Sequence, residues 1–171
     1  MKKRLLCAGL AAAMAVSLTA CGGSAAGTKA EGSSASAEAN SEGGSEAAKV
    51  FKIGGIGPVT GGAAVYGMAV QHGTELAVNE INAAGGINGY QIEFQFQDDE
   101  HDAEKSVNAY NTLKDWGMQV LVGTTTSAPC LAVADKTAAD NMFQITPSGS
   151  VVECAANPNV FRICYSDPDQ G

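Results

Sequence analysis

The sequence predicts an α/β fold built on a doubly wound parallel sheet. Between residues 50 and 163 the hydrophobic period switches repeatedly between the two-residue period of strands and the 3.6-residue period of helices. Five strand patterns and three helical connections result, which is typical of a parallel sheet with helices on both faces. The second strand pattern is half polar and belongs at a sheet edge, which favours the strand order 2-1-3-4-5.

The first two strands and the helix between them come from contrasting patterns. Residues 50–56 are a short apolar strand that Gly57 and Pro58 end. Residues 66–84 carry small and apolar side chains on one helical stripe, which predicts a helix facing the core. The stripe consists of Ala69, Gly73, Leu76, Ala77, Ile81 and Ala84. Residues 91–97 alternate strictly between polar and apolar side chains, so we expect an edge strand with one solvated face.

The second half of the domain continues the alternation of helices and strands. A helix is predicted between Asp102, which can cap it, and Gly117, which ends it. One face of this helix consists of Ala103, Val107, Tyr110 and Leu113. Residues 120–122 are continuously apolar, as expected for a central strand covered on both faces. A third helix is predicted over residues 128–141, and two further strands over residues 143–145 and 160–163.

The first 21 residues predict export and lipidation. Three basic residues precede an apolar run at residues 5–19, and the sequence Leu-Thr-Ala-Cys that ends at Cys21 has the form of a lipobox. We therefore expect residues 1–20 to be a signal peptide, and Cys21 to carry a lipid that anchors the chain on the extracytoplasmic face of the cell membrane. An uncleaved anchor is the alternative, but the run is shorter than the ~20 apolar residues of a spanning helix.

Composition separates a linker from a folded domain. Residues 21–48 consist mainly of Gly, Ser, Ala and Glu, without aromatic or branched aliphatic side chains, so we expect a flexible linker. Residues 49–171 are long enough for one compact domain with a hydrophobic core. The formal net charge is −8, and loss of residues 1–20 leaves seven basic and eighteen acidic residues, a charge of −11. This acidity argues against a nucleic-acid partner.

Three cysteines remain after the signal peptide and Cys21 are set aside. They are Cys130, Cys154 and Cys164, and an exported chain can oxidise such thiols to disulfides. Buried free thiols are one interpretation, and a bridge from Cys154 to either Cys130 or Cys164 is the other. Neither a Cys-x-x-Cys motif nor paired His spacing indicates a metal site, and we expect no metal or cofactor.

The candidate ligand site lies where the order of the strands reverses. Ligands of doubly wound sheets bind beyond the carboxyl ends of the strands, where the loops at residues 57–66, 123–127 and 146–150 should meet. Ser127 lies at the start of a predicted helix, whose free N–H groups attract a carboxylate. Ser148 and Ser150 add polar groups from the neighbouring loop. The alternative is that these hydroxyls only cap turns and helices.

These residues resemble the branched-chain amino-acid binding lipoproteins and periplasmic proteins that feed ABC transporters. The resemblance covers the whole domain and rests on several short pieces taken together. They are residues 53–57, Thr60-Gly61 with Tyr66-Gly67, Glu80-Ile81-Asn82 with residues 85–89, Asp98-Asp99, residues 123–127, Thr146-Pro147-Ser148, Phe161-Arg162 and residues 167–171. The resemblance implies the first lobe of a type I periplasmic-binding-protein fold, with an amino acid as ligand and an ABC permease as partner.

The resemblance also implies roles for individual residues. Ser127 and Ser150 match the hydroxyl residues that hold the ligand carboxylate, and Ser148 matches a position whose backbone carbonyl accepts from the ammonium group. Tyr66 matches an aromatic residue that closes over the ligand. Two linked cysteines of the family fall on His101 and Thr126, so that disulfide cannot form here.

Other functions remain as alternatives. Family members close two lobes around the ligand, and the chain up to Gly171 matches the first, so we expect the side-chain wall and the acid that pairs with the ammonium group on a second lobe. The chain could thus be a truncated, non-functional fragment of such a protein. A ligand-binding sensor module, which uses the same kind of lobe, is a second alternative to a transport component. An enzyme is disfavoured, because residues 55–60 lack the third glycine of a dinucleotide fingerprint. Residues 98–102 suit a metal site less well than the capped start of a helix.

Overall fold

The computed structural model describes residues 49–171. The predicted signal peptide, Cys21 and the whole predicted linker lie outside the described residues. The elements in chain order are β1 (Val50–Gly57), α1 (Ala64–Ala83), β2 (Gln91–Asp98), α2 (Ala103–Trp116), β3 (Val120–Val122), α3 (Ser127–Ala139), β4 (Phe143–Thr146), η1 (Val152–Ala155), β5 (Val160–Arg162) and η2 (Asp167–Gln170), where η denotes a 3-10 helix.

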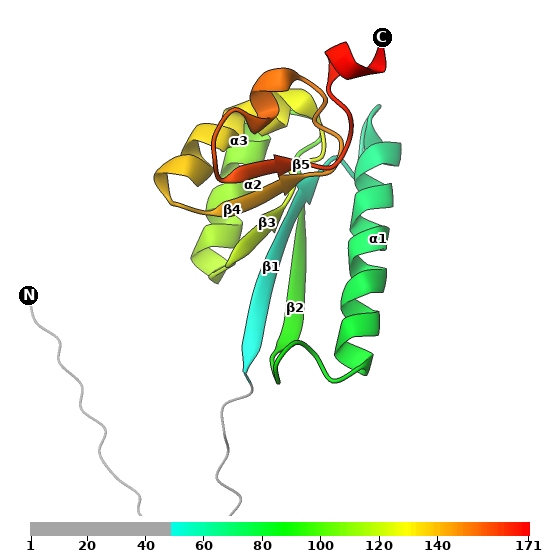
Figure 1. The fold of residues 1–171 in the computed structure, drawn as a ribbon, viewed down its shortest axis with the longest axis vertical. Coiled ribbons are helices and arrows are strands. Elements are labelled where there is room, and N and C mark those ends of the chain that lie inside the picture. The colour runs from blue at the N-terminus through cyan, green and yellow to red at the C-terminus, as the bar shows by residue number, and fades with distance from the viewer. Residues whose placement is uncertain (1–48) are drawn as a thin grey trace, which may run out of the picture. The chain divides into compact units, whose positions relative to one another are not determined.

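The five strands form one parallel sheet in the order β2-β1-β3-β4-β5 (Figure 1). The predicted fold class and strand order are thus confirmed. β1 pairs along its whole length with β2, while its second half also pairs with β3. The order reverses between β1 and β3, so the loops after these two strands diverge to opposite sides of the sheet and leave a crevice at its carboxyl edge.

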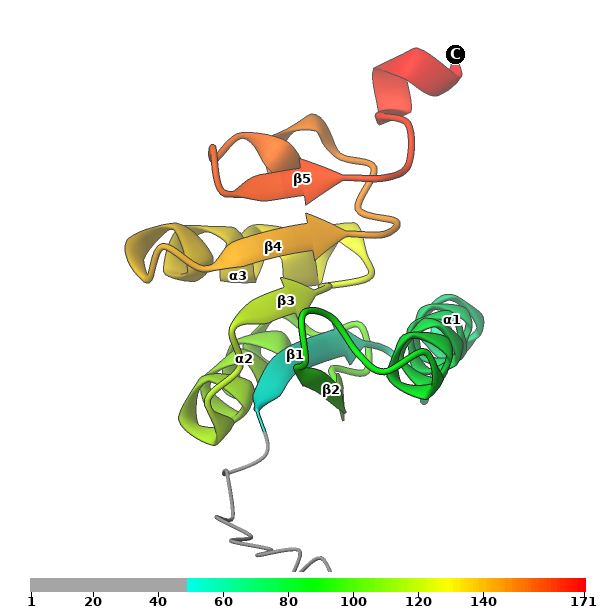
Figure 2. The same ribbon diagram turned by 60° about the horizontal axis from the view of Figure 1, so that its bottom comes forward.

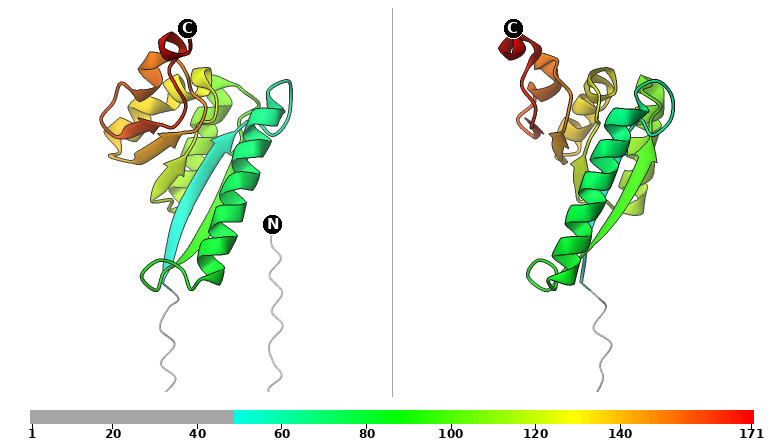
Figure 3. Two further views of the ribbon diagram at one scale, coloured as in Figure 1. Left: turned by 45° about the vertical axis from the view of Figure 1, so that its right-hand side comes forward. Right: turned by 90° about the vertical axis from the view of Figure 1, so that its right-hand side faces the viewer.

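Helices cover both faces of the sheet. α1 runs along β1 and β2 on one face, whereas α2 and α3 pack beside each other on the other face (Figures 2 and 3). The connection from β4 to β5 carries the short 3-10 helix η1 in place of an α-helix, which the sequence did not predict. Within residues 49–171, none of the helices combines the length and the apolar character that crossing a membrane requires.

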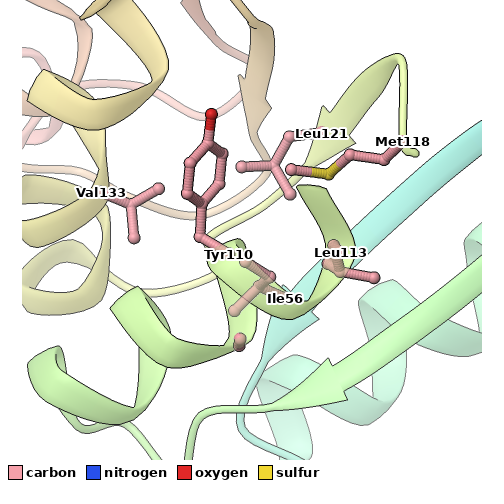
Figure 4. Packing of buried hydrophobic residues seen from close by; sticks show 7 residues of the cluster. Ile56, Tyr110, Leu113, Met118, Leu121 and Val133 are labelled. Carbon is pink, nitrogen blue, oxygen red and sulfur yellow. The ribbon is translucent and has the colours of Figure 1, made fainter. Parts of the chain in front are cut away.

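The main core lies between the sheet and the two helices α2 and α3, which cover one of its faces. Tyr110 and Leu113 from α2 meet Ile56 and Leu121 from the central strands and Val133 from α3, and all five side chains are buried (Figure 4). The remaining members of the cluster are Ala109 and Met118. A fully buried Leu or Ile side chain is worth about 1.5–3 kcal/mol, so this cluster fixes both helices to the sheet.

The predicted ends of α2 are confirmed. The Asp102 carboxylate accepts a hydrogen bond of 2.8 Å from the backbone N–H of Lys105, the arrangement of a helix N-cap. Gly117 ends the helix in the left-handed conformation, with φ of 91°. Of the predicted inner face, Tyr110 and Leu113 are buried and Val107 is partly buried against the core, whereas Ala103 in the first turn is exposed.

The predicted inner stripe of α1 is wrong for five of its six residues; the sixth, Ile81, is partly buried. Leu76 is 61 % exposed, and Ala69, Gly73, Ala77 and Ala84 are exposed as well. The face toward the sheet instead includes Gly67 and Val78, both buried. Two contacts that hydrophobic spacing does not reveal decide this rotation of the helix. Gly67 packs directly against the backbone of Pro58, and the Asn82 side chain makes two 2.8 Å hydrogen bonds to the backbone of Ile92.

The edge position predicted for β2 is confirmed, but its strict alternation of burial holds only at the start. Ile92 is buried between the exposed side chains of Gln91 and Glu93, as predicted. From Phe94 onward every side chain of the strand is half-buried. α1 packs on one face of β2 and α2 on the other, and both faces are therefore partly covered.

Candidate functional site

A cavity of about 460 Å³ opens at the carboxyl edge of the sheet. Its lining residues come from the start of α1, the start of α3 and the segments that follow β2, β4 and β5. They are Tyr66, His101, Thr126, Ser127, Ser148, Ser150, Cys164 and Gln170. The four ligand residues predicted from the sequence, Tyr66, Ser127, Ser148 and Ser150, therefore lie around one cavity.

Ser127 links the two loops that carry the predicted hydroxyl groups. It is the first residue of α3, and its Oγ accepts hydrogen bonds from the backbone N–H groups of Ser150 and Val151 at 3.1 and 3.5 Å. The loop after β4 is thereby held against the N-terminus of α3. Because the first N–H groups of a helix have no partner within the helix, this end carries a partial positive charge beside the Ser127 and Ser150 hydroxyls.

Arg162 supports the same loop from the neighbouring strand. Its guanidinium donates to the backbone carbonyl of Val151 at 3.1 Å and to that of Ser150 at 3.5 Å. The backbone N–H of Asp167 also donates to the Ser150 carbonyl, at 2.9 Å. Residues 150–151 are thus held on their N–H side by Ser127 and on their carbonyl side by β5 and the segment after it.

The hydroxyls of Thr125 and Thr146 bond to the backbone of neighbouring segments. Thr124 and Thr125 are fully buried, and the Thr125 hydroxyl donates to the carbonyl of Ile56 at 3.1 Å. The Thr146 hydroxyl donates to the Thr124 carbonyl at 2.9 Å and accepts from the backbone N–H of Gly149 at 3.1 Å. For the hydroxyls of Thr125 and Thr146 the structural interpretation considered from the sequence is correct. Ser127 and Ser150 are set apart because both line the cavity.

The loop before α1 is fixed by Asp98, the last residue of β2. The Asp98 carboxylate accepts from the backbone N–H of Val59 at 2.9 Å, from the Thr60 hydroxyl at 2.6 Å and from the N–H of Glu100 at 2.9 Å. Although burial raises the pKa of Asp98, the hydrogen bonds from Thr60 and the backbone outweigh it and hold this pKa below the ordinary value. Asp98 is therefore ionised and structural.

Gly67 lets α1 start directly against this loop. A Cβ atom at position 67 would lie only 1.8 Å from the carbonyl oxygen of Pro58, so no other residue fits there. The close approach places the neighbouring Tyr66 at the mouth of the cavity, where its side chain is 57 % exposed. An exposed aromatic side chain at the rim is free to pack on whatever enters the cavity.

The acidic segment at residues 98–102 has the structural role favoured from the sequence. Asp98 holds a loop and Asp102 caps α2, while Asp99 is fully buried and accepts from the backbone N–H of His101 at 2.9 Å. Burial raises the pKa of Asp99 above its ordinary value. Among residues 49–171 no three His, Cys, Asp or Glu side chains are grouped so as to hold a metal ion.

Sequence reasoning missed half of the cavity lining. His101 and Thr126 lie where the resemblance places two linked cysteines, which indicated that they are neighbours but not that they line the cavity. Their side chains are joined by a hydrogen bond of 2.8 Å between Nδ1 and Oγ1. Cys164 and Gln170 lie after β5, where the sequence has no hydrophobic period that predicts a turn of the chain toward the cavity.

The chemistry of the cavity suits a small carboxylate. The eight lining residues include four hydroxyl-bearing Ser and Thr side chains and one Tyr, but no Asp, Glu, Lys or Arg. Neutral hydroxyls and backbone N–H groups at a helix N-terminus can bind an anion without a formal positive charge. A group that could neutralise a ligand ammonium is not among these eight residues.

Comparison with known proteins places the chain in a family. Residues 50–171 match the family model described as periplasmic binding protein. The chain is 35 % identical over 120 residues to Leu/Ile/Val-binding protein homolog 3 of Brucella melitensis, covering 69 % of this chain and 33 % of that protein. It is 34 % identical over 129 residues to the leucine-, isoleucine-, valine-, threonine- and alanine-binding protein of Pseudomonas aeruginosa, covering 74 % and 35 % of the two chains.

Solved structures agree. The branched-chain amino-acid transporter substrate-binding protein LivJ of Streptococcus pneumoniae, solved with isoleucine, superposes with a TM-score of 0.66 at 31 % identity and covers 70 % of this chain and 35 % of its own. The leucine-binding protein LivK of Thermotoga maritima shares the fold, with a TM-score of 0.63 at 24 % identity. The chain spans about a third of the length of the curated relatives it matches. By sequence and by fold, the chain belongs to the periplasmic binding protein family.

Proposed function

We propose that this chain provides the first lobe of an extracytoplasmic solute-binding protein that delivers branched-chain amino acids to an ABC permease. The observation that carries the proposal is the placement of the Ser127 and Ser150 side chains in one cavity, at the N-terminus of α3. Two relatives are named as proteins that bind leucine, isoleucine and valine, and one similar solved structure contains bound isoleucine. A binding role also fits a lining of hydroxyl groups.

In the proposed complex the ligand carboxylate lies against α3. The hydroxyls of Ser127 and Ser150 donate to its two oxygens, and the partial positive charge of the helix end adds to the attraction. The backbone carbonyl of Ser148 accepts from the ligand ammonium, and Tyr66 packs over the ligand at the rim. The side-chain wall and the acid that completes the ammonium site belong to a second lobe, which closes on the first.

The proposed location follows from the N-terminal sequence. Residues 1–20 direct export, Cys21 is lipidated, and the linker at residues 21–48 lets the lobe reach a permease while the lipid holds the protein at the membrane. A tethered, mobile binding protein favours delivery to a permease over sensing, because a sensor must pass a signal through the membrane.

The test is a titration followed by amide NMR on the full chain with leucine, isoleucine or valine. Binding to one lobe leaves much of a ligand in water, so we expect weak, fast-exchanging binding. The backbone amide signals of Ser127 and Ser150 should move with each amino acid, and much less with leucinamide, which lacks the carboxylate. If no amide responds to any of the three amino acids, the substrate class is wrong.

The matched variant is Ser150→Ala. It removes the side-chain hydroxyl proposed to bind the ligand. It keeps the backbone N–H that donates a hydrogen bond to Ser127 Oγ, so the fold of the loop is preserved. We expect about tenfold or greater weakening of leucine binding, since a hydrogen bond to a charged group is worth about 1.5–3 kcal/mol and each 1.4 kcal/mol is a factor of ten. Equal shifts with leucine and leucinamide, or unchanged affinity in the variant, would remove the carboxylate assignment while leaving amino-acid binding intact.

A further inference from the structure

Two cysteines lie together directly behind the candidate site. Cys130 in the first turn of α3 and Cys154 in η1 are both fully buried. The Cys130 thiol donates to the backbone carbonyl of Cys154 at 3.7 Å, and the Cys154 thiol donates to the carbonyl of Ser127 at the same distance. Each cysteine therefore hydrogen bonds to the segment that carries the other.

Gly149 shows how closely the two side chains approach. A Cβ atom at this position would lie 3.2 Å from Sγ of Cys154 and 3.5 Å from Cβ of Cys130. Both cysteines therefore pack against the same point of the loop after β4. By contrast, Cys164 is only partly buried and lines the cavity. Of the two bridges left open by the sequence, the contacts of Cys154 favour the one to Cys130.

We propose that Cys130 and Cys154 form a disulfide that joins η1 covalently to α3, beside the loop after β4. The two thiols lose two electrons and two protons, and an Sγ–Sγ bond forms. A disulfide oxidant, such as oxidised glutathione or an exported thiol oxidase, accepts the two electrons and two protons, and its own disulfide is reduced to two thiols. This pair is distinct from the two linked cysteines that the resemblance places at His101 and Thr126. The inference rests on the proposed export of the chain but not on the proposed ligand.

The bond forms during folding. Burial, together with the neighbouring Cys130 thiol, raises the pKa of Cys154 to about 12, so the reactive thiolate is scarce once the domain has folded. Before the loop at Gly149 closes, both thiols are accessible and exchange with a disulfide oxidant proceeds. An exported chain, as the first 21 residues predict, folds in a compartment where such oxidants are present.

The disulfide restrains the loop that carries Ser150. Ser127 accepts from the N–H groups of Ser150 and Val151, and the Ser127 carbonyl in turn faces the Cys154 thiol. Oxidation removes the two thiol protons and their hydrogen bonds, and replaces them with a covalent bond between α3 and η1, the segment that follows this loop. The amides of Ser150 and Val151 should exchange their hydrogens more slowly in the oxidised protein than in the reduced protein.

The experiment refolds the reduced full chain in a buffer of reduced and oxidised glutathione, blocks free thiols with N-ethylmaleimide and maps the peptides by mass spectrometry. We expect a linked peptide pair containing Cys130 and Cys154, and a labelled or glutathionylated Cys164. The Cys164→Ser variant should give the same linked pair. Free, labelled thiols at both positions 130 and 154, or a pair between Cys154 and Cys164, would overturn the proposal.

A second measurement needs no substitution. The oxidised chain and the same chain reduced with a phosphine should differ in melting temperature, with the oxidised form higher by about 10 °C, because the bond restricts the unfolded chain between residues 130 and 154. An equal or lower melting temperature of the oxidised form would show that the native structure does not accommodate the bond, and would also overturn the proposal.

Discussion

Nδ1 of His101 lies 2.8 Å from Oγ1 of Thr126. This hydrogen bond joins the residues just before α2 and α3, at the positions where the resemblance places two linked cysteines of the family. The chain therefore keeps the cross-connection between the two loops but makes it with polar side chains. Both residues also line the candidate cavity, so the connection and the site share one location.

The double variant His101→Cys with Thr126→Cys should form a disulfide. The two side chains already meet, and a bridge between these positions should stabilise the domain by about 3 kcal/mol through the unfolded chain. Peptide mapping under oxidising and reducing conditions identifies the bond, and urea unfolding measures the gain. The control is His101→Cys alone. Free thiols at both positions of the double variant would show that the backbones are too far apart for a bridge.

Ser127→Ala should destabilise the domain, whereas Ser150→Ala should not. Ser127 Oγ accepts from two backbone N–H groups, so its loss leaves them without that partner and lowers the free energy of unfolding by about 1–2 kcal/mol. Ser150 takes part through its backbone, which alanine retains. Urea unfolding of both variants and the wild type checks this. Equal stability of the two variants would mean that the Ser127 hydroxyl does not hold the loop.

Gly67→Ala and Gly73→Ala should have opposite effects although both lie in α1. At position 67 the new Cβ atom would overlap the Pro58 carbonyl, so α1 must move away from its loop, at a cost of about 3 kcal/mol or more. At position 73 a Cβ atom meets open space, and the better helix propensity of alanine should add about 0.5–1 kcal/mol. Thermal unfolding followed by circular dichroism measures both. A tolerated Gly67→Ala would contradict the close packing.

Asp98→Asn should lower stability near neutral pH but not in acid. The pKa of Asp98 in the folded protein lies below its ordinary value of 3.8, so its ionised form stabilises the fold above pH 3.8 and this contribution is lost as the pH falls through the lower, folded pKa. We expect the variant to be less stable than wild type by about 1 kcal/mol at neutral pH, with the difference shrinking below pH 3.8. Urea unfolding across this pH range measures the difference.

Asp99→Asn is the contrasting control for this pH profile. Burial raises the pKa of Asp99, so its ionisation weakens the fold as the pH rises above 3.8. The Asp99→Asn variant should therefore gain stability relative to wild type as the pH rises from 3.8, the reverse of the trend at position 98. Parallel profiles for the two variants would contradict the assigned environments of these neighbouring carboxyl groups.

Local patterns in the sequence predicted most of the fold correctly. The apolar run at Val120–Val122 indicated a central strand, and the half-polar second strand indicated an edge, which together gave the strand order that the structure shows. Asp102 and Gly117 marked the ends of α2. The strand order also brought the three loops to one edge, so the four predicted ligand residues were found around one cavity.

The failures have a common cause in contacts between distant residues. The inner face of α1 follows from the approach of Gly67 to Pro58 and from the Asn82 side chain on β2, neither of which has a hydrophobic period. The short helix η1 forms where the chain packs on α3. Gln170 reaches the cavity only because the segment after β5 turns toward it, held in part by the hydrogen bond from Asp167 to Ser150.

The sequence by itself determined the class of fold, the strand order and the loops that carry the site, because hydrophobic period, caps and turn residues act over a few neighbouring positions. Only the tertiary structure decided which hydroxyls face the cavity and which support the backbone, that His101 bonds to Thr126, and that Cys154 lies against Cys130. Those choices depend on the packing of side chains far apart in the chain, where a shift of about one ångström changes the partner of a hydrogen bond.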